Sequence, residues 1–221
     1  MQTFSDVENG VLSLSGLEEE VVVLGPGAWA FTVRFITKRY IGDYAPNVEM
    51  LYTHKMIGSR DEINLEILDT ASDMSAETLE KHIKWADGYL LIYSVTDRDS
   101  YQAACSFKDQ LFQLRGSDLP VVLVSNKHDL LTARAVTEDE GANLEGELDC
   151  PRFQISVAEG QEGVTQVMDE LLVLIKRELV KSLTAPSPTQ DSVAGLEKKS
   201  RLYNMKKAFK KRIVRSRSDT F

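Results

Sequence analysis

The chain has 221 residues, 43% of them hydrophobic and 27% charged, which is typical of a soluble globular protein with one well-cored domain and a tail. No run of 18 consecutive apolar residues occurs, so the sequence offers no transmembrane candidate, and the polar, acidic N-terminus does not resemble a signal peptide. The 2 cysteines lie far apart and the 3 histidines have no metal-ligand spacing. We therefore expect free thiols in a reducing compartment and no metal site built from His and Cys.

The net charge of −8 hides an acidic body and a basic tail. Residues 197–221 carry 10 Lys and Arg against 2 Asp and Glu, a charge of +8, whereas residues 1–196 carry 16 against 32, a charge of −16. A stretch rich in Pro, Ser and Thr precedes the tail and is typical of a linker. We therefore expect an acidic flexible N-terminus over 1–19, one folded domain over 20–182, a linker over 183–196 and the basic tail over 197–221.

Short apolar runs alternate with longer amphipathic stretches in the folded part. In chain order they predict a strand at 21–24, a helix at 30–40, strands at 50–57 and 64–68, a helix at 76–85, a strand at 89–95, a helix at 100–114, a strand at 121–126, a helix at 138–145, a strand at 153–156 and a helix at 164–181. Strands separated by helices predict an α/β fold, with a doubly wound, mostly parallel six-stranded sheet and helices on both faces. The second and third strands are joined by a short polar turn, so we expect a hairpin that adds one antiparallel edge strand.

Polar and small residues follow the predicted strands. Gly25, Asp69, Asn126 and Ser156 each come at or just after a strand end. Ligands of doubly wound sheets bind at the carboxyl ends of the strands. We therefore expect these four residues to share one rim.

Residues 126–129 (NKHD) match an N-K-x-D motif directly after a buried strand. The Asp129 carboxylate can accept hydrogen bonds from N1–H and the exocyclic amine of guanine, and adenine presents no such donor pair. The Lys127 stem can cover the base, and Asn126 can tie this loop to the loop after the first strand. Ser156, in residues 155–158 (ISVA), can support the Asp129 carboxylate. An ordinary polar turn is the alternative, but the order and spacing of the other elements favour guanine recognition.

With these motifs in place, residues 20–182 resemble the Ras-like small GTPases. Residues 33–44 (VRFITKRYIGDY) and 85–89 (WADGY) are most similar to the branch of the estrogen-regulated growth inhibitor and its Ras-like relatives. The resemblance implies the P-loop GTPase fold, GTP or GDP with Mg²⁺ as ligands, and effector and regulator proteins as partners.

The resemblance also implies roles for individual residues. Tyr40 stands where an aromatic ring packs edge-on against the base, and Asp69 stands where an aspartate approaches Mg²⁺ and the γ-phosphate. Asn47 replaces the first-switch threonine, and its side-chain oxygen can still coordinate the ion. Asp73 stands at the position of the glutamine that orients the attacking water. Because Asp73 is shorter and negative, we expect very slow intrinsic GTP hydrolysis.

The loop that should hold the phosphates departs from the family pattern G-x-x-x-x-G-K-S/T. Residues 25–32 (GPGAWAFT) contain no lysine. A charge-assisted hydrogen bond contributes about 1.5–3 kcal/mol, so its loss weakens binding by roughly one to two decades. Arg34 and Lys38 are the nearest possible substitutes, but both lie turns away along the helix.

Two alignments of this loop compete. Without a gap, Gly25 and Gly27 approach the phosphates and Thr32 binds Mg²⁺. Aligned from the downstream side, the loop is about three residues short and Trp29 occupies the position of the Mg²⁺-binding Ser or Thr. The second alignment is favoured because the family spacing holds without a gap from Thr32 to Asp69. The same gap is what a variant or splice product of an ordinary GTPase would show.

The basic tail has features of its own. The chain ends in SDTF and residue 2 is Gln, so we expect no prenyl or myristoyl anchor. On a helix the tail would carry one apolar stripe beside basic residues, which suits an anionic membrane surface or a calmodulin-like groove; the stripe comprises Leu202, Met205, Phe209 and Ile213. Residues 206–212 (KKAFKKR) equally resemble a nuclear or nucleolar address. A solvated disordered tail is the alternative, and tail-driven binding of RNA or chromatin is a weaker hypothesis.

The leading hypothesis is a Ras-like guanine-nucleotide-binding signalling protein with weak or impaired GTP hydrolysis. We expect it in the cytoplasm, with peripheral plasma-membrane or nuclear placement through the tail. The rival hypothesis is a nucleotide-free pseudo-GTPase scaffold that acts through its surface and its basic tail.

Overall fold

The computed structural model describes residues 18–41, 48–57, 62–71 and 74–184. The elements are, in chain order, β1 Glu18–Leu24, α1 Ala28–Thr37, β2 Met50–Ile57, β3 Glu62–Asp69, α2 Ala76–Trp85, β4 Gly88–Ser94, α3 Arg98–Arg115, β5 Val121–Asn126, the short 3₁₀ helix η1 Leu131–Ala133, α4 Glu138–Leu148, β6 Arg152–Gln154 and α5 Gln161–Thr184. The chain divides after Glu178 into two compact units, and the sheet belongs to the first. The predicted basic tail lies outside the described residues.

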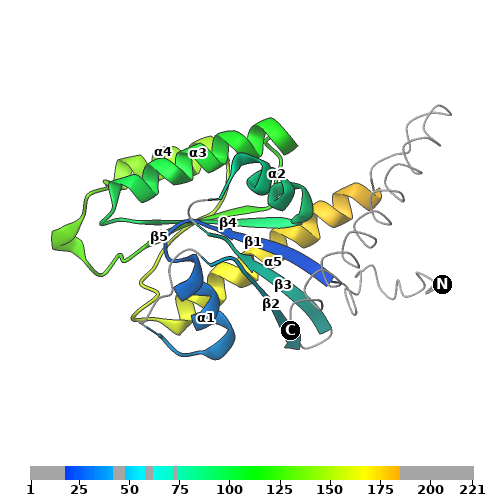
Figure 1. Cartoon of the computed structure of the whole chain (residues 1–221), viewed down its shortest axis with the longest axis horizontal. Helices are drawn as coiled ribbons and strands as arrows, with labels where there is room; N and C mark the ends of the chain where they lie inside the picture. The colour runs from blue at the N-terminus through cyan, green and yellow to red at the C-terminus, as the bar shows by residue number, and fades with distance from the viewer. Residues whose placement is uncertain (1–17, 42–47, 58–61, 72–73, 185–221) are drawn as a thin grey trace. The chain divides into compact units, whose positions relative to one another are not determined.

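The six strands form one sheet in the order β2-β3-β1-β4-β5-β6 (Figure 1). Only β2 and β3 pair antiparallel, in a register that runs from Met50 opposite Asp69 to Ile57 opposite Glu62. The other four pairings are parallel. The predicted α/β fold with a mostly parallel six-stranded sheet and one antiparallel edge strand is therefore confirmed.

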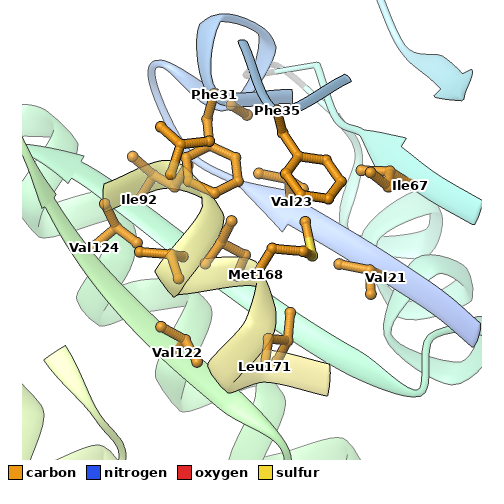
Figure 2. Close-up of a cluster of buried hydrophobic side chains, with 14 of the residues drawn as sticks. Val21, Val23, Phe31, Phe35, Ile67, Ile92, Val122, Val124, Met168 and Leu171 are labelled. Carbon is orange, nitrogen blue, oxygen red and sulfur yellow. The ribbon is translucent and has the colours of Figure 1, made fainter. Parts of the chain in front are cut away.

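Helices cover both faces of this sheet. Figure 1 shows α1 and α5 on one face and α2, α3 and α4 on the other. Successive side chains of β1 alternate between the faces, so Val21 and Val23 join the first hydrophobic cluster while Val22 and Leu24 join the second. In the first cluster, the rings of Phe31 and Phe35 from α1 lie over the sheet beside Met168 and Leu171 of α5 (Figure 2). No helix among the described residues is both long enough and apolar enough to cross a membrane.

Several element ends differ from the prediction. β1 begins at Glu18, inside the range predicted to be flexible, because residues 18–20 pair with β3 despite their charge. Helix α1 ends at Thr37 instead of residue 40, since Lys38 adopts a left-handed conformation with φ of 63° and caps it. Strand β6 ends at Gln154, so Ser156 follows it by two residues. Helix α5 continues through Thr184, beyond the predicted end.

Candidate functional site

The loop between β1 and α1 is a tight turn of only three residues. Gly25 follows the last residue of β1, and α1 begins at Ala28. The Ala28 N–H donates to the Gly25 carbonyl at 3.1 Å, with Pro26 and Gly27 between them. Gly27 has φ of 93° and ψ of 1°, which together with proline at the preceding position matches a type II turn. The turn is thus closed by its own backbone hydrogen bond.

Both glycines of the turn are required by their surroundings. A Cβ atom on Gly25, which has φ of 109°, would collide with the carbonyl oxygen of Ile92 on β4. A Cβ atom on Gly27 would lie 3.0 Å from Nδ2 of Asn126. The structure therefore brings Gly25 and Gly27 together with Asn126 at the carboxyl edge of the sheet, as the sequence predicts.

The position of α1 supports the alignment with a short loop. Thr32 is the fifth residue of the helix and has no exposed surface, and its Oγ1 has no hydrogen-bond partner. Mg²⁺ retains several water ligands in most protein sites. A hydroxyl without solvent access does not fit such an ion, so the structure argues against Thr32 as a ligand.

Trp29 occupies the position that the short-loop alignment gives to the Mg²⁺-binding hydroxyl. The Tyr52 hydroxyl of β2, which neighbours it, donates to the Met50 sulfur at 3.3 Å. Burial, followed by the nearby Asp69 charge, raises the pKa of Tyr52, and the neighbouring Trp29 indole N–H, which can only donate, lowers it.

Sequence reasoning missed Tyr52. The register of the β2–β3 hairpin places Tyr52 near the site, because Met50 lies opposite Asp69 and Tyr52 lies opposite Ile67. Tyr52 is therefore a diagonal neighbour of Asp69 on the same face of the sheet. That register depends on pairing between two strands, which no single strand pattern specifies.

Asp69 ends β3 and is only 3% exposed. Burial raises the pKa of its carboxyl group from an ordinary 3.8 to about 7. No group of three or more His, Cys, Asp or Glu side chains able to hold a metal ion occurs in the described part of the chain. The predicted ligand Asn47 and the predicted catalytic position Asp73 lie outside the described residues. Mg²⁺ is usually held by one or two carboxylates together with waters and phosphate oxygens. Of the predicted ligands that the structure describes, Asp69 offers a carboxylate, whereas the Thr32 hydroxyl is buried in α1.

The raised pKa of Asp69 predicts a pH dependence of stability. Because the folded protein holds this proton more tightly than the unfolded chain, the contribution of Asp69 is most favourable below about pH 4 and is lost as the pH rises towards 7. The loss amounts to a few kcal/mol at ~1.4 kcal/mol per pKa unit. Urea unfolding between these pH values should show it, and Asp69→Asn should flatten the slope. The exposed Asp109→Asn is the control and should retain the wild-type slope.

The two cations proposed as substitutes for the lysine are engaged elsewhere. The Arg34 guanidinium donates to the Ala158 carbonyl at 3.1 Å, which ties α1 to the loop after β6. The Lys38 ammonium lies 4.9 Å from the centre of the Phe35 ring. No basic residue precedes Arg34 in the chain. Neither cation contacts the Pro-Gly turn in the described structure.

The loop after β5 has the geometry expected of a base-binding loop. Lys127 has φ of 60°, an uncommon left-handed conformation for a residue other than glycine. The His128 N–H donates to the Ile155 carbonyl at 3.1 Å, which anchors the loop to the segment after β6. The Asp129 side chain is exposed and makes no hydrogen bond or ion pair with any described residue. Its oxygens are therefore available to a ligand.

Asn126 connects three loops, as its predicted role requires. Its Oδ1 accepts the Lys127 N–H at 2.7 Å and the Val157 N–H at 3.1 Å. Its amide nitrogen faces Gly27 of the Pro-Gly turn. Asn126 is 5% exposed, so these contacts are largely shielded from water.

Ser156 and Tyr40 are the other two residues predicted to support the base. The Ser156 Oγ accepts the Glu159 N–H at 3.3 Å within its own turn, and the predicted contact with Asp129 is not among the hydrogen bonds of the described residues. Tyr40, which follows α1, is 50% exposed. Its predicted packing against a base is not tested by the protein alone.

Replacing Asn126 by alanine should destabilise the protein by about 2–4 kcal/mol, because two N–H donors lose their acceptor. Ser156→Ala is the matched control. It removes one acceptor from a turn in which the Glu159 N–H also meets the Ser156 carbonyl, so less than about 1 kcal/mol is expected. Urea unfolding of both variants measures the difference, and equal losses would contradict the bridging role of Asn126.

Comparisons with known proteins find sequence relatives over most of the chain. A family model for the Ras family matches residues 20–177. The human Ras-related and estrogen-regulated growth inhibitor is 34% identical over 154 residues, which cover 69% of this chain and 77% of that protein. The rat Ras-like protein family member 11A is 34% identical over 200 residues, which cover 82% of this chain and 83% of that protein. The mouse Ras-like protein family member 12 is 34% identical over 173 residues, covering 75% and 65%.

Proposed function

Because this chain belongs to the Ras family, we propose that it is a guanine-nucleotide-binding signalling protein with weak GTP hydrolysis. The family in general binds guanine nucleotide and Mg²⁺ and acts through effector and regulator proteins. The observation that carries the proposal is the loop after β5, in which Asn126 holds the backbone and the Asp129 carboxylate is available to guanine. Lys127 follows with its stem exposed at the same loop.

The first experiment measures the nucleotide content of the purified full chain. The protein is denatured and the supernatant is assayed for GDP and GTP, beside the Asp129→Asn variant prepared in the same way. Guanine nucleotide that is retained by the wild type and absent from the variant supports the proposal. For a weakly held nucleotide that is lost during purification, the melting measurement decides. A guanosine-dependent rise in melting temperature is the second measurement, since a ligand that binds the folded state raises its stability.

Weak hydrolysis is supported by the composition of the catalytic segments. Residues 25–32 contain no lysine, and Asp73 replaces the glutamine that orients the attacking water in relatives. In a single-turnover assay we expect a rate constant below about 10⁻⁴ per second, slower than the intrinsic rate of Ras. Hydrolysis at or above the ordinary Ras-like rate would contradict this part of the proposal.

A nucleotide-free pseudo-GTPase is the second candidate. It is favoured by one observation, the Pro-Gly turn that is closed by the hydrogen bond from the Ala28 N–H to the Gly25 carbonyl. This candidate predicts no nucleotide in the denatured supernatant and no melting shift with any guanosine compound. The two candidates are thus separated by the same pair of measurements.

The basic tail is proposed to bind an anionic membrane surface or a calmodulin-like groove, and the protein is proposed to be cytoplasmic and peripheral to the plasma membrane. The charge of +8 over residues 197–221 supports this. Truncation after residue 196 should abolish binding to vesicles that contain anionic lipid. If the truncated chain binds these vesicles as well as the full chain, the tail is not the membrane-binding segment. A tail-dependent nuclear or nucleolar location in cells would support the address hypothesis instead.

A further inference from the structure

The geometry points to a guanine-nucleotide site that is independent of Mg²⁺ and indifferent to the number of phosphates, so that GMP binds about as tightly as GTP. This inference rests on the proposed function and names the class of ligand that the same site takes. It follows from a difference between two parts of the site. The loop after β5, which we call the base half, presents a carboxylate that is available to guanine. The Pro-Gly turn and the start of α1, which we call the phosphate half, have groups that are engaged with other groups of the protein.

The metal position is the first part of this half. Trp29 stands there in place of a hydroxyl-bearing residue. The hydroxyl of the neighbouring Tyr52 donates to the Met50 sulfur. Thr32, the other candidate hydroxyl, has no exposed surface, and Asp69 contributes a buried carboxylate.

The phosphate donors are the second part. A helix N-terminus binds anions through its first four N–H groups, which have no partner within the helix. In α1 one of these donors, that of Ala28, is bonded to the carbonyl of Gly25 at 3.1 Å. The turn therefore satisfies a donor that a longer loop would direct at a phosphate.

The charge beside the turn is the third part. A cavity of about 180 Å³ adjoins Gly25 and Pro26, and Asp97 and Asp99 are among its lining residues. Arg34 and Lys38 are engaged with Ala158 and Phe35 as described. Residues 25–32 contain no lysine, so an added phosphate meets no cation from this loop while its negative charge comes near two aspartates. Additional phosphates therefore contribute little to the affinity.

The loop after β5 differs from the phosphate half because its carboxylate has no partner in the described structure that a ligand would have to displace. The carboxylate of Asp129 has no competing partner among the described residues, and the backbone that carries it is held by bonds to Asn126 and Ile155. Two charge-assisted hydrogen bonds from guanine contribute about 3–6 kcal/mol. The affinity consequently depends on the base, and it is retained when phosphates and metal are removed.

The test is isothermal titration of the nucleotide-free full chain with GMP, GDP, GTP and ATP, each in the presence of MgCl₂ and in the presence of EDTA. We expect the three guanosine ligands to bind within about tenfold of one another, a span of ~1.4 kcal/mol. We expect EDTA to change each Kd by less than about threefold and ATP to bind far more weakly. GTP binding that is about 100-fold tighter than GMP binding, and that is lost in EDTA, would overturn the inference while leaving the proposed function intact.

A loop-repair variant provides the matched comparison. Residues 25–29 are replaced by an eight-residue loop of the pattern G-x-x-x-x-G-K-T, which restores the length, the lysine and the hydroxyl together. This variant should acquire a GTP preference over GMP of roughly 100-fold and a dependence on Mg²⁺. If the wild type already shows both properties, the short turn does not control them and the inference fails. If no guanosine ligand binds to the wild type, the proposed function fails as well.

Discussion

Replacing Asp129 by asparagine is expected to weaken the binding of guanosine nucleotides by about two to four decades and to create binding of xanthosine nucleotides. The carboxylate accepts two hydrogen bonds from guanine, each contributing about 1.5–3 kcal/mol because the acceptor is charged. Asparagine keeps an oxygen for N1–H, but its amide nitrogen then meets the exocyclic amine donor to donor. Xanthine carries a carbonyl at that position, so the amide nitrogen of the variant can donate to it.

The gain of xanthosine binding matters because it separates a change of specificity from a failure to fold. Titration with GMP and xanthosine monophosphate measures both effects on the same preparation. Asp109→Asn is the control, since it removes the same charge from an exposed position on α3, where the side chain is 66% exposed. Guanosine affinity in Asp129→Asn within about threefold of wild type would show that the loop after β5 does not recognise the base.

Replacing Gly25 by alanine is expected to destabilise the protein by about 2–6 kcal/mol. A side chain at φ of 109° is strained, at a cost of about 1–3 kcal/mol. The added methyl group also collides with the Ile92 carbonyl in the centre of the sheet, and such overpacking costs about 1–3 kcal/mol more. At ~2–4 °C per kcal/mol for a domain of this size, the melting temperature should fall by roughly 5–20 °C.

Gly116→Ala separates the two contributions to this loss. Gly116 also has a positive φ, of 86°, but a Cβ atom added there meets nothing within 4 Å. Its replacement should therefore cost only the backbone strain, about 1–3 kcal/mol. Thermal unfolding of the two variants in parallel provides the measurement. Equal losses of stability in the two variants would mean that the collision with β4 does not contribute to the destabilisation of Gly25→Ala.

Local patterns predicted the elements whose ends are defined by nearby residues. Helix α2 begins where predicted because Ser75 caps it by accepting the Thr78 N–H. Strand β5 has the predicted bounds, with an unbroken apolar run over residues 121–124 that is followed by Ser125 and Asn126. Helix α1 was predicted less well, since its start depends on how the Pro-Gly turn closes and its end on the backbone conformation of Lys38.

Long-range contacts account for what local patterns missed. Glu19 was expected in the flexible N-terminus, yet it is 7% exposed because pairing with β3 extends the strand. Ser156 was expected to contact Asp129, but its hydroxyl is used in its own turn. In each case the outcome depends on a partner that the local residue pattern does not specify.

The sequence by itself determined the base-recognition motif of residues 126–129, the absence of a lysine from residues 25–32 and the α/β order of the elements. Each of these features is defined by residue types at short spacings along the chain, so it can be recognised without the tertiary structure. Only the tertiary structure decided which protein groups lie beside the Pro-Gly turn and the start of α1. The proximity of Trp29 and Tyr52 places a helix beside the edge hairpin, and the contact of Gly25 with Ile92 joins a turn to a neighbouring strand. Both depend on the packing of α1 and on strand register, which arise from contacts between segments distant in the chain.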